Sequence, residues 1–164
     1  MNKITAIVLA AGSGSRMKSK TKKQFMEIKG KPVIWYSLFE FEKSRVDEII
    51  LVTGKEDIDY CKKEIVEKYN LKKIKNVVAG GSERYESVYN GLKEVTGNIV
   101  LIHDGARPLI NNEIIERIKT TAQALILALF SLNDRLIFIK PAYAIHIPII
   151  ILTIEANVLS PVNE

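Results

Sequence analysis

The strongest constraint on the fold of this chain is a repeated alternation between short apolar runs and amphipathic segments. Runs rich in Ile, Val and Leu predict buried strands at 4–10, 48–53, 74–79 and 98–103. Apolar residues at helical spacing predict helices at 32–44, 57–69 and 82–95, and from Glu113 onward. Strands that are apolar throughout and alternate with helices are typical of a parallel sheet covered on both faces. The expected fold class is therefore α/β, with a mostly parallel sheet and helices on both faces.

Local signals predict where these helices begin. Pro32 is expected at the first position of its helix, and Asn111 or Asn112 can cap the helix that begins at Glu113. Ser82 is expected to cap the helix that follows it. The apolar face of that helix is predicted to comprise Tyr85, Val88, Tyr89, Leu92 and Val95.

The chain contains one cysteine, Cys61, on the apolar face of the helix predicted at 57–69, and we expect it in the core. A lone cysteine excludes a disulfide framework and a zinc site built from a cysteine cluster, and it fits a reducing compartment. No secretory signal opens the chain, so the expected localisation is cytoplasmic.

Composition divides the chain near residue 119. Residues 1–119 contain 50 apolar residues (42%) with 22 basic and 16 acidic ones, whereas residues 120–164 contain 27 apolar residues (60%) with two basic and three acidic ones. The first segment has the composition of an ordinary globular domain, and the second has little polar surface. We therefore treat 120–164 as a divergent apolar segment that either completes or truncates the domain formed by 1–119.

Three interpretations of residues 120–164 are open. The segment can complete the sheet with one helix and one or two strands, residues 136–154 can contact a membrane, or the segment can be the out-of-frame ending of a truncated gene. The membrane candidate is interrupted by Lys140, Pro141, His146 and Pro148. We favour the out-of-frame ending, because the segment lacks surface charge and a clear periodicity.

A loop of small residues follows the first predicted strand. It comprises Ala10, Ala11, Gly12, Ser13 and Gly14, with Arg16 directly after it and Lys23 nearby. Small residues let the backbone approach a ligand closely, and successive N–H groups can bind phosphate oxygens. The two cations suit a triphosphate that is attacked at its α-phosphorus. The loop lacks the Gly-Lys-Ser/Thr of a P-loop and the third glycine of the dinucleotide fingerprint, and a tight turn with a solvated basic run is the alternative.

A second motif, Gly80-Gly-Ser-Glu-Arg-Tyr-Glu-Ser87, follows the third predicted strand. The glycines permit close approach to a flat base, and Ser82 and Ser87 can donate hydrogen bonds near a helix N-terminus. A glycine turn with a helix cap is the alternative.

A third motif, His103-Asp-Gly-Ala-Arg-Pro108, follows the fourth predicted strand. Asp104 can hold Mg²⁺ together with nucleotide phosphate oxygens, and Arg107 can bind a phosphate with its guanidinium. A turn stabilised by an Asp104–Arg107 pair is the alternative, and His103 is expected to be structural. Because ligands bind beyond the carboxyl ends of parallel strands, we expect the three motifs to form one crevice.

Taken together, these motifs resemble the 2-C-methyl-D-erythritol 4-phosphate cytidylyltransferase family over about residues 3–119. The motifs are Ala10-Ala-Gly-x-Gly-x-Arg-Met17, Lys23-Gln24, Gly80-Gly-x-x-Arg84-x-x-Ser87 and His103-Asp-Gly-Ala-Arg-Pro108. The resemblance implies a Rossmann-like nucleotidyltransferase sandwich. It also implies transfer of a cytidylyl group from CTP to 2-C-methyl-D-erythritol 4-phosphate with release of pyrophosphate, in the non-mevalonate isoprenoid precursor pathway.

The resemblance also implies a role for each matching residue. Arg16 and Lys23 would be catalytic, stabilising the transition state. The nucleotide would be bound by Ala10, Ala11, Gly12, Ser13, Gly14, Gly81, Ser82, Arg84, Ser87 and Asp104. Asp104 would hold Mg²⁺ or another divalent cation, and Ala106 and Arg107 would bind the acceptor substrate.

The expected partners are CTP and a polyol phosphate, and the resemblance implies a homodimer. Nucleic acid is not expected, because the basic run from Lys18 to Lys23 lacks interleaved aromatic residues, and a membrane partner is not expected either. Two alternatives stay open: a truncated, inactive CTP-binding fragment, and a related sugar- or polyol-phosphate nucleotidylyltransferase such as ribitol 5-phosphate cytidylyltransferase.

Overall fold

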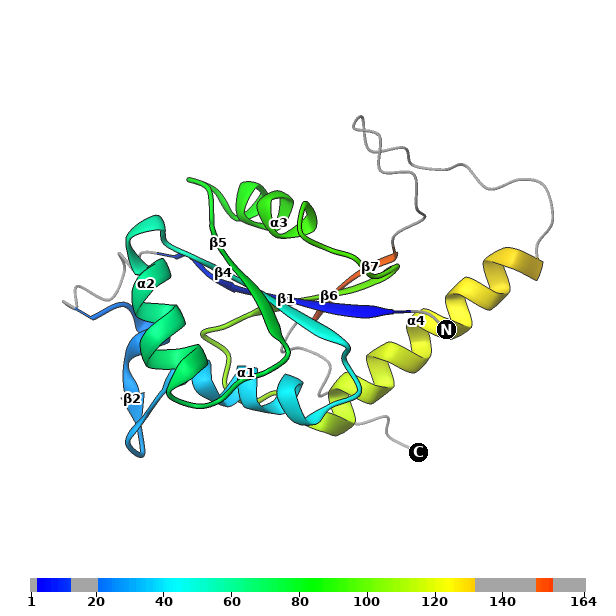
Figure 1. Cartoon of the computed structure of the whole chain (residues 1–164). Helices are drawn as coiled ribbons and strands as arrows, with labels where there is room; N and C mark the ends of the chain where they lie inside the picture. The colour runs from blue at the N-terminus through cyan, green and yellow to red at the C-terminus, as the bar shows by residue number, and fades with distance from the viewer. Residues whose placement is uncertain (1–2, 13–20, 132–149, 155–164) are drawn as a thin grey trace.

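A parallel five-stranded sheet forms the centre of the molecule (Figure 1). A computed structural model describes residues 3–12, 21–131 and 150–154 of the chain. The strands are β1 (Ile4–Ala10), β4 (Glu48–Thr53), β5 (Ile74–Ala79), β6 (Ile99–Asp104) and β7 (Ile150–Ile154). Their order in the sheet is β5-β4-β1-β6-β7, and every pairing is parallel. The parallel sheet predicted from the apolar runs is thus confirmed.

Helices cover both faces of this sheet. The principal ones are α1 (Val33–Lys43), α2 (Ile58–Tyr60) with its π-helical continuation η4 (Cys61–Glu67), α3 (Arg84–Leu92) and α4 (Asn112–Ser131). Two short 3-10 segments, η2 (Lys23–Phe25) and η3 (Lys55–Asp57), complete the described helices. Figure 1 shows α3 on one side of the sheet and α1 with α4 on the other. The α/β class with helices on both faces is therefore confirmed.

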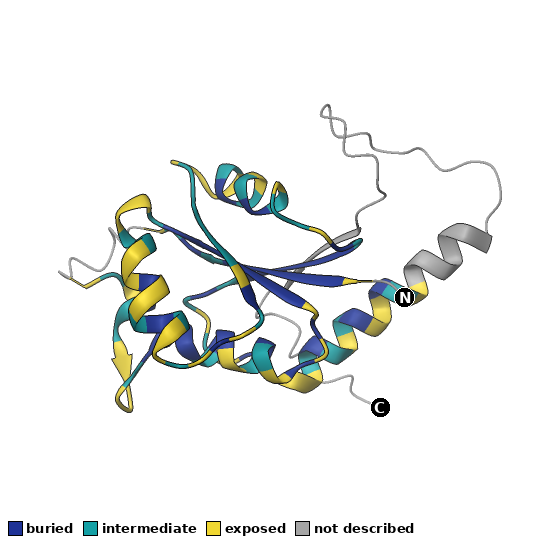
Figure 2. Cartoon of the chain, in the orientation of Figure 1, coloured by how far each residue is buried: buried dark blue, intermediate teal, exposed yellow. Residues whose placement is uncertain are grey.

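Alternate residues of the strands form two separate cores. In Figure 2 the central strands are coloured mostly as buried. On the face covered by α1, Ala6 and Val8 of β1 pack with Ile34 and Phe41, and Cys61 is fully buried there as predicted. On the opposite face lie Ile7, Ile50, Val52, Val100 and Ile102. Val88, Leu92 and Val95 pack against that second core. The period of two in each strand thus distributes apolar side chains to both faces.

Helix α3 differs from its prediction in two ways. Its N-cap is Glu83, in a capping box with Glu86, and not Ser82. Tyr85 and Tyr89 are 70% and 43% exposed, so assigning them to the apolar face was wrong. The helix approaches the sheet at Gly91, where an added Cβ would lie 2.9 Å from Cγ2 of Ile7. This close approach leaves no room for tyrosine rings on the buried face.

The other predicted helix starts agree more closely with the structure. Pro32 is the N-cap of α1, one position before its expected place. Asn111 caps α4, since its Oδ1 accepts a hydrogen bond of 2.9 Å from the Ile114 amide. A two-stranded hairpin formed by β2 (Glu27–Ile28) and β3 (Lys31–Pro32) was not predicted. Its turn, Lys29-Gly30, has positive φ angles of 51° and 73°, typical of a tight hairpin.

The structure also describes two elements beyond residue 119. Helix α4 passes through residue 119 without a break, so the compositional boundary falls inside this helix. Strand β7 pairs in parallel with β6, from Ile99–Ile150 to His103–Ile154. One helix and one strand are the elements of the first interpretation above, while the division of the chain at residue 119 stays a prediction. Within the described parts of the chain, no helix is long and apolar enough to cross a membrane.

Candidate functional site

The strand order places the winding reversal of the sheet at β1. From β1 the chain proceeds to β4 and β5 on one side and then crosses to β6 on the other side. In sheets of this kind, the loops at the carboxyl ends of the strands diverge at such a point and leave a crevice for a ligand. The first motif follows β1 and the third follows β6, so both begin at this reversal.

The third motif contacts the end of β1, directly before the first motif, through the backbone. The Gly105 amide donates a hydrogen bond of 2.7 Å to the Leu9 carbonyl. A Cβ added at Gly105 would lie 3.1 Å from that oxygen and 3.2 Å from Cγ1 of Val8. A residue without a side chain at 105 therefore lets the third motif cross the end of β1.

The first and second motifs meet at Gly80. A Cβ added at Gly80 would lie 2.4 Å from Cβ of Ala11 and 2.6 Å from Oγ of Ser87. Ser87 is buried, and its hydroxyl accepts a hydrogen bond from the Gly81 amide (3.1 Å) and donates one to the Glu83 carbonyl (3.2 Å). Ser87 thus fixes the glycine turn from within the second motif, and Gly80 of that turn lies against Ala11.

Replacing Gly80 with alanine is expected to lower the free energy of unfolding by about 1–3 kcal/mol, as overpacking of a close contact does. The added methyl group meets Cβ of Ala11, which can move only with its backbone. Urea unfolding followed by the fluorescence of the single tryptophan, Trp35, measures the effect. Gly12→Ala is the matched control, because no described residue lies within 4 Å of a Cβ added at Gly12. Equal stability losses in the two variants would contradict the packing of Gly80.

The second and third motifs are joined by charge. Asp104, at the end of β6, has one carboxylate oxygen 3.2 Å from Nη2 of Arg84 and the other 3.1 Å from Nε of Arg107. The Asp104–Arg107 turn pair considered above is therefore present, but a second guanidinium from another strand end joins it. Both arginines are about half exposed, so these ion pairs contribute little to stability and the guanidinium groups can reach a ligand.

Ser82 and Glu86 form a local network at the start of α3. The Glu86 carboxylate accepts hydrogen bonds from the Ser82 amide (2.7 Å) and the Ser82 hydroxyl (2.8 Å). These bonds, the hydroxyl first, lower the pKa of Glu86. The capping alternative for this motif is thus realised in the structure, with Glu86 as the member that the sequence interpretation missed.

The remaining predicted residues of the first loop are partly described. Ala10 is buried at the end of β1, Ala11 is half-buried and Gly12 is exposed. Lys23 is exposed at the start of η2, whereas Ser13, Gly14 and Arg16 lie outside the described residues. Gly81 of the second motif and Ala106 of the third motif are both half-buried.

The buried side chain of His103 holds the third motif through the Arg107 carbonyl. Its Nε2 lies 3.1 Å from the Arg107 carbonyl and 3.2 Å from Oγ of Ser37, which itself donates a hydrogen bond of 3.0 Å to that carbonyl. Burial disfavours the charged imidazolium and lowers the pKa of His103 to about 4, although Asp104 and the Arg107 carbonyl act in the opposite direction. His103 is therefore a neutral structural donor, as expected. Ser37 was missed, although its polar side chain on the apolar face of α1 was the available signal.

The free energy of unfolding is expected to fall by about 3 kcal/mol between pH 6.5 and pH 4 because of His103. The unfolded chain binds a proton at this residue near pH 6.5, whereas the folded chain binds it only near pH 4. More than about one pH unit above the unfolded pKa of 6.5, neither state is protonated, so His103 adds no pH dependence there. Urea unfolding at a series of pH values measures the slope.

His103→Phe is the variant that isolates this effect from the other titrating groups, including His146, which lies outside the described residues. The variant should lose this part of the slope between pH 6.5 and pH 4. An unchanged slope would show that His103 titrates normally in the folded protein.

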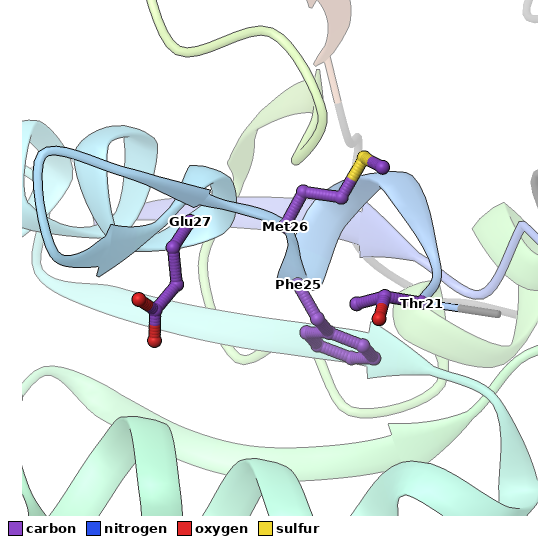
Figure 3. Close-up of a pocket in the computed structure, with 4 residues that line it drawn as sticks. All are labelled: Thr21, Phe25, Met26 and Glu27. Carbon is purple, nitrogen blue, oxygen red and sulfur yellow. The ribbon is translucent and has the colours of Figure 1, made fainter. Parts of the chain in front are cut away.

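A separate open cleft of about 470 Å³ lies beside the Lys23 segment. Its walls are Thr21, Phe25, Met26 and Glu27 (Figure 3). Of these four residues Glu27 alone is charged, and a carboxylate repels phosphate groups. We therefore place the candidate site where the three motifs meet and not in this cleft.

The described residues contain no cluster of three or more His, Cys, Asp or Glu side chains that could enclose a metal ion. Asp104 fits a different arrangement, in which a single carboxylate shares Mg²⁺ with substrate phosphates. Its carboxylate is partly exposed at the end of β6 and faces the guanidinium groups of Arg84 and Arg107.

Comparison with known proteins agrees with this geometry. A sequence profile of 2-C-methyl-D-erythritol 4-phosphate cytidylyltransferase matches residues 4–146, beyond the last motif recognised in the sequence. The protein of that name from Clostridium acetobutylicum is 56% identical over 113 residues, which are 68% of this chain and 49% of the relative. The one from Lachnoclostridium phytofermentans is 54% identical over 119 residues, which are 72% of this chain and 51% of that relative. The chain thus spans about half the length of these relatives.

Solved structures give the same result. The 4-diphosphocytidyl-2C-methyl-D-erythritol synthase of Anaerococcus prevotii superposes with a TM-score of 0.62 and 36% identity, over 73% of this chain and 50% of that one. The bifunctional IspDF of Campylobacter jejuni superposes with a TM-score of 0.62 and 26% identity, over 74% of this chain and 31% of that one. The profile covers most of this chain, and its motifs converge at one edge of the sheet, so the chain belongs to the 2-C-methyl-D-erythritol 4-phosphate cytidylyltransferase family.

Proposed function

We propose that this chain binds CTP at the carboxyl edge of its sheet and transfers the cytidylyl group to 2-C-methyl-D-erythritol 4-phosphate, releasing pyrophosphate. The observation that carries the proposal is the junction of three strand-end motifs, through Gly80 against Ala11, Gly105 against Leu9, and Arg84 against Asp104. Membership of the family supports the identity of both substrates.

The reaction needs little proton transfer. A phosphate oxygen of the acceptor forms a bond to the α-phosphorus of CTP, and the bond from that phosphorus to the bridging oxygen breaks, so that pyrophosphate leaves. The attacking phosphate is already ionised at neutral pH and requires no general base. The rate must therefore come from positioning and from neutralisation of negative charge.

The residues of the candidate site suit these two tasks. The backbone of Ala10, Ala11, Gly12, Ser13 and Gly14 would surround the triphosphate, with the Arg16 and Lys23 side chains neutralising charge at the reacting phosphorus. Gly81, Ser82, Arg84 and Ser87 would form the cytidine side. Ala106 and Arg107 would line the pocket towards the acceptor phosphate, where a guanidinium can bind two oxygens at once.

Asp104 is the residue that would hold Mg²⁺ or another divalent cation, and when bound the ion would neutralise charge on the phosphates of CTP. In this structure both Asp104 oxygens face guanidinium groups. We infer that Arg107, which is about half exposed, would turn from the carboxylate to the acceptor phosphate when the substrates are bound. The homodimer and the cytoplasmic location are likewise proposals.

The test is an assay of pyrophosphate release by the full chain with CTP, Mg²⁺ and 2-C-methyl-D-erythritol 4-phosphate. We expect release that requires all three and is much slower with UTP, ATP or GTP. Equal or faster release with ribitol 5-phosphate would identify a different acceptor. Absence of release from a chain that still binds CTP would overturn the proposed transfer.

That last outcome is the second candidate function, a chain that binds CTP without transferring it. The observation that favours it is the extent of the match, because the part of this chain that aligns with its curated relatives spans only about half of their length. Nucleotide binding measured beside turnover separates the two candidates.

A further inference from the structure

Gln24 is a buried polar side chain next to the exposed Lys23. Gln24 is 3% exposed although it lies in the short segment η2 near the surface. Burying a primary amide is unfavourable unless its donors and acceptors are satisfied. Its burial therefore calls for specific partners.

Those partners are the backbone of the loop after β1. Nε2 of Gln24 donates hydrogen bonds to the carbonyl oxygens of Ala10, at 2.6 Å, and Gly12, at 3.0 Å. An amide nitrogen carries two protons and can serve both acceptors. Ala10 is the last residue of β1 paired with β4, and Gly12 lies beyond the sheet. The Gln24 side chain thus substitutes for a strand partner at the point where the loop leaves the sheet.

Lys22, which precedes Lys23, is also fixed in place by partners from another segment of the chain. Its ammonium group forms ion pairs with Glu56 and Asp57, which belong to the connection between β4 and α2. Lys22 is therefore a structural cation. Both neighbours of Lys23 are anchored, one to the loop after β1 and one to the loop after β4.

We propose that Gln24 is a positioning residue, whose two hydrogen bonds hold the backbone of residues 10–12 beside the Lys23 segment, so that both engage the same triphosphate. The proposal rests on the proposed function, because it assigns to the loop and to Lys23 a shared ligand. No contact of Gln24 with the nucleotide is required, since it acts through the carbonyl groups of Ala10 and Gly12.

The test is a double-mutant cycle between Gln24 and Lys23, read by CTP affinity in calorimetry and by turnover in the pyrophosphate assay. Gln24→Glu keeps the shape of the side chain but replaces its donor group with an acceptor facing two carbonyl oxygens. We expect it to weaken CTP binding at least about tenfold in the native sequence and less than about twofold when Lys23 is already alanine. Gln123→Glu, the same change on α4, is the matched control and should leave both quantities unchanged.

The following results would overturn the proposal or separate it from the proposed function. Equal losses in both backgrounds would show that Gln24 acts independently of Lys23 and would overturn it, as would full CTP affinity in Gln24→Glu. If Gln24→Glu fails to fold, Gln24→Met, which removes the donors without adding a charge, replaces it in the cycle, with unfolding curves confirming the folded fraction. A native chain that binds CTP but releases no pyrophosphate overturns the proposed transfer alone, and the affinity cycle still decides on Gln24. A native chain that binds no CTP overturns both.

Discussion

Replacing Lys23 with alanine is expected to lower the turnover of pyrophosphate release by about 10²- to 10³-fold, which is the usual effect of removing one preorganised charge-stabilising group. The side chain is exposed at the start of η2, and substitutions at such positions change the free energy of unfolding by about 0.5 kcal/mol or less. A large loss of turnover with a normal urea unfolding curve is therefore the expected combination.

Lys62→Ala is the matched control for Lys23, because Lys62 is an exposed lysine on η4, outside the candidate site. It should leave turnover unchanged. Native turnover in Lys23→Ala would refute the charge-stabilising role, and a matching loss in Lys62→Ala would point to a general effect of positive charge.

Replacing Asp104 with asparagine is expected to raise the Mg²⁺ concentration required for half-maximal turnover by about tenfold to a hundredfold, because the carboxylate proposed to hold the cation loses its charge. The effect on stability should be small. Both ion pairs of Asp104 join it to half-exposed arginines, and exposed pairs of this kind contribute about 0–1 kcal/mol each.

The measurement is a Mg²⁺ titration of turnover at saturating CTP. Asp59→Asn, at an exposed position of α2, is the control and should give the native curve. If Asp104→Asn shifts the unfolding midpoint but not the Mg²⁺ dependence, Asp104 is only a structural partner of Arg84 and Arg107.

Four strands of the parallel sheet, β1, β4, β5 and β6, were predictable because each is a short run rich in apolar residues. Runs such as Glu48–Thr53 are buried at every position, and they alternate with helices whose apolar residues lie on one stripe. Helix α3 was the exception. Its buried face includes Ser87 and Gly91, so the periodicity of the larger apolar residues pointed to Tyr85 and Tyr89 instead. The close packing of this helix on the sheet at Gly91 depends on tertiary structure, and a hydrophobic pattern in the sequence does not predict it.

The candidate site was predictable in its parts but not in its connections. The three motifs could be placed at strand ends from the sequence, whereas the contacts between them depend on strand order. The Arg84–Asp104 pair spans 20 residues, and the Gln24–Ala10 hydrogen bond joins two segments through a buried amide. The ion pairs of Lys22 with Glu56 and Asp57 are a further contact between distant segments that the sequence did not predict.

The central claim is that three strand ends form a single nucleotide site, and a calorimetric titration of the full chain with CTP and Mg²⁺ tests it most directly. We predict one CTP bound per native chain and much weaker binding of GTP to the same chain. The Arg84→Ala variant should also bind CTP much more weakly, because the Arg84 side chain links two of the motifs. No CTP binding by the folded chain, or equal binding of CTP and GTP, would contradict the claim.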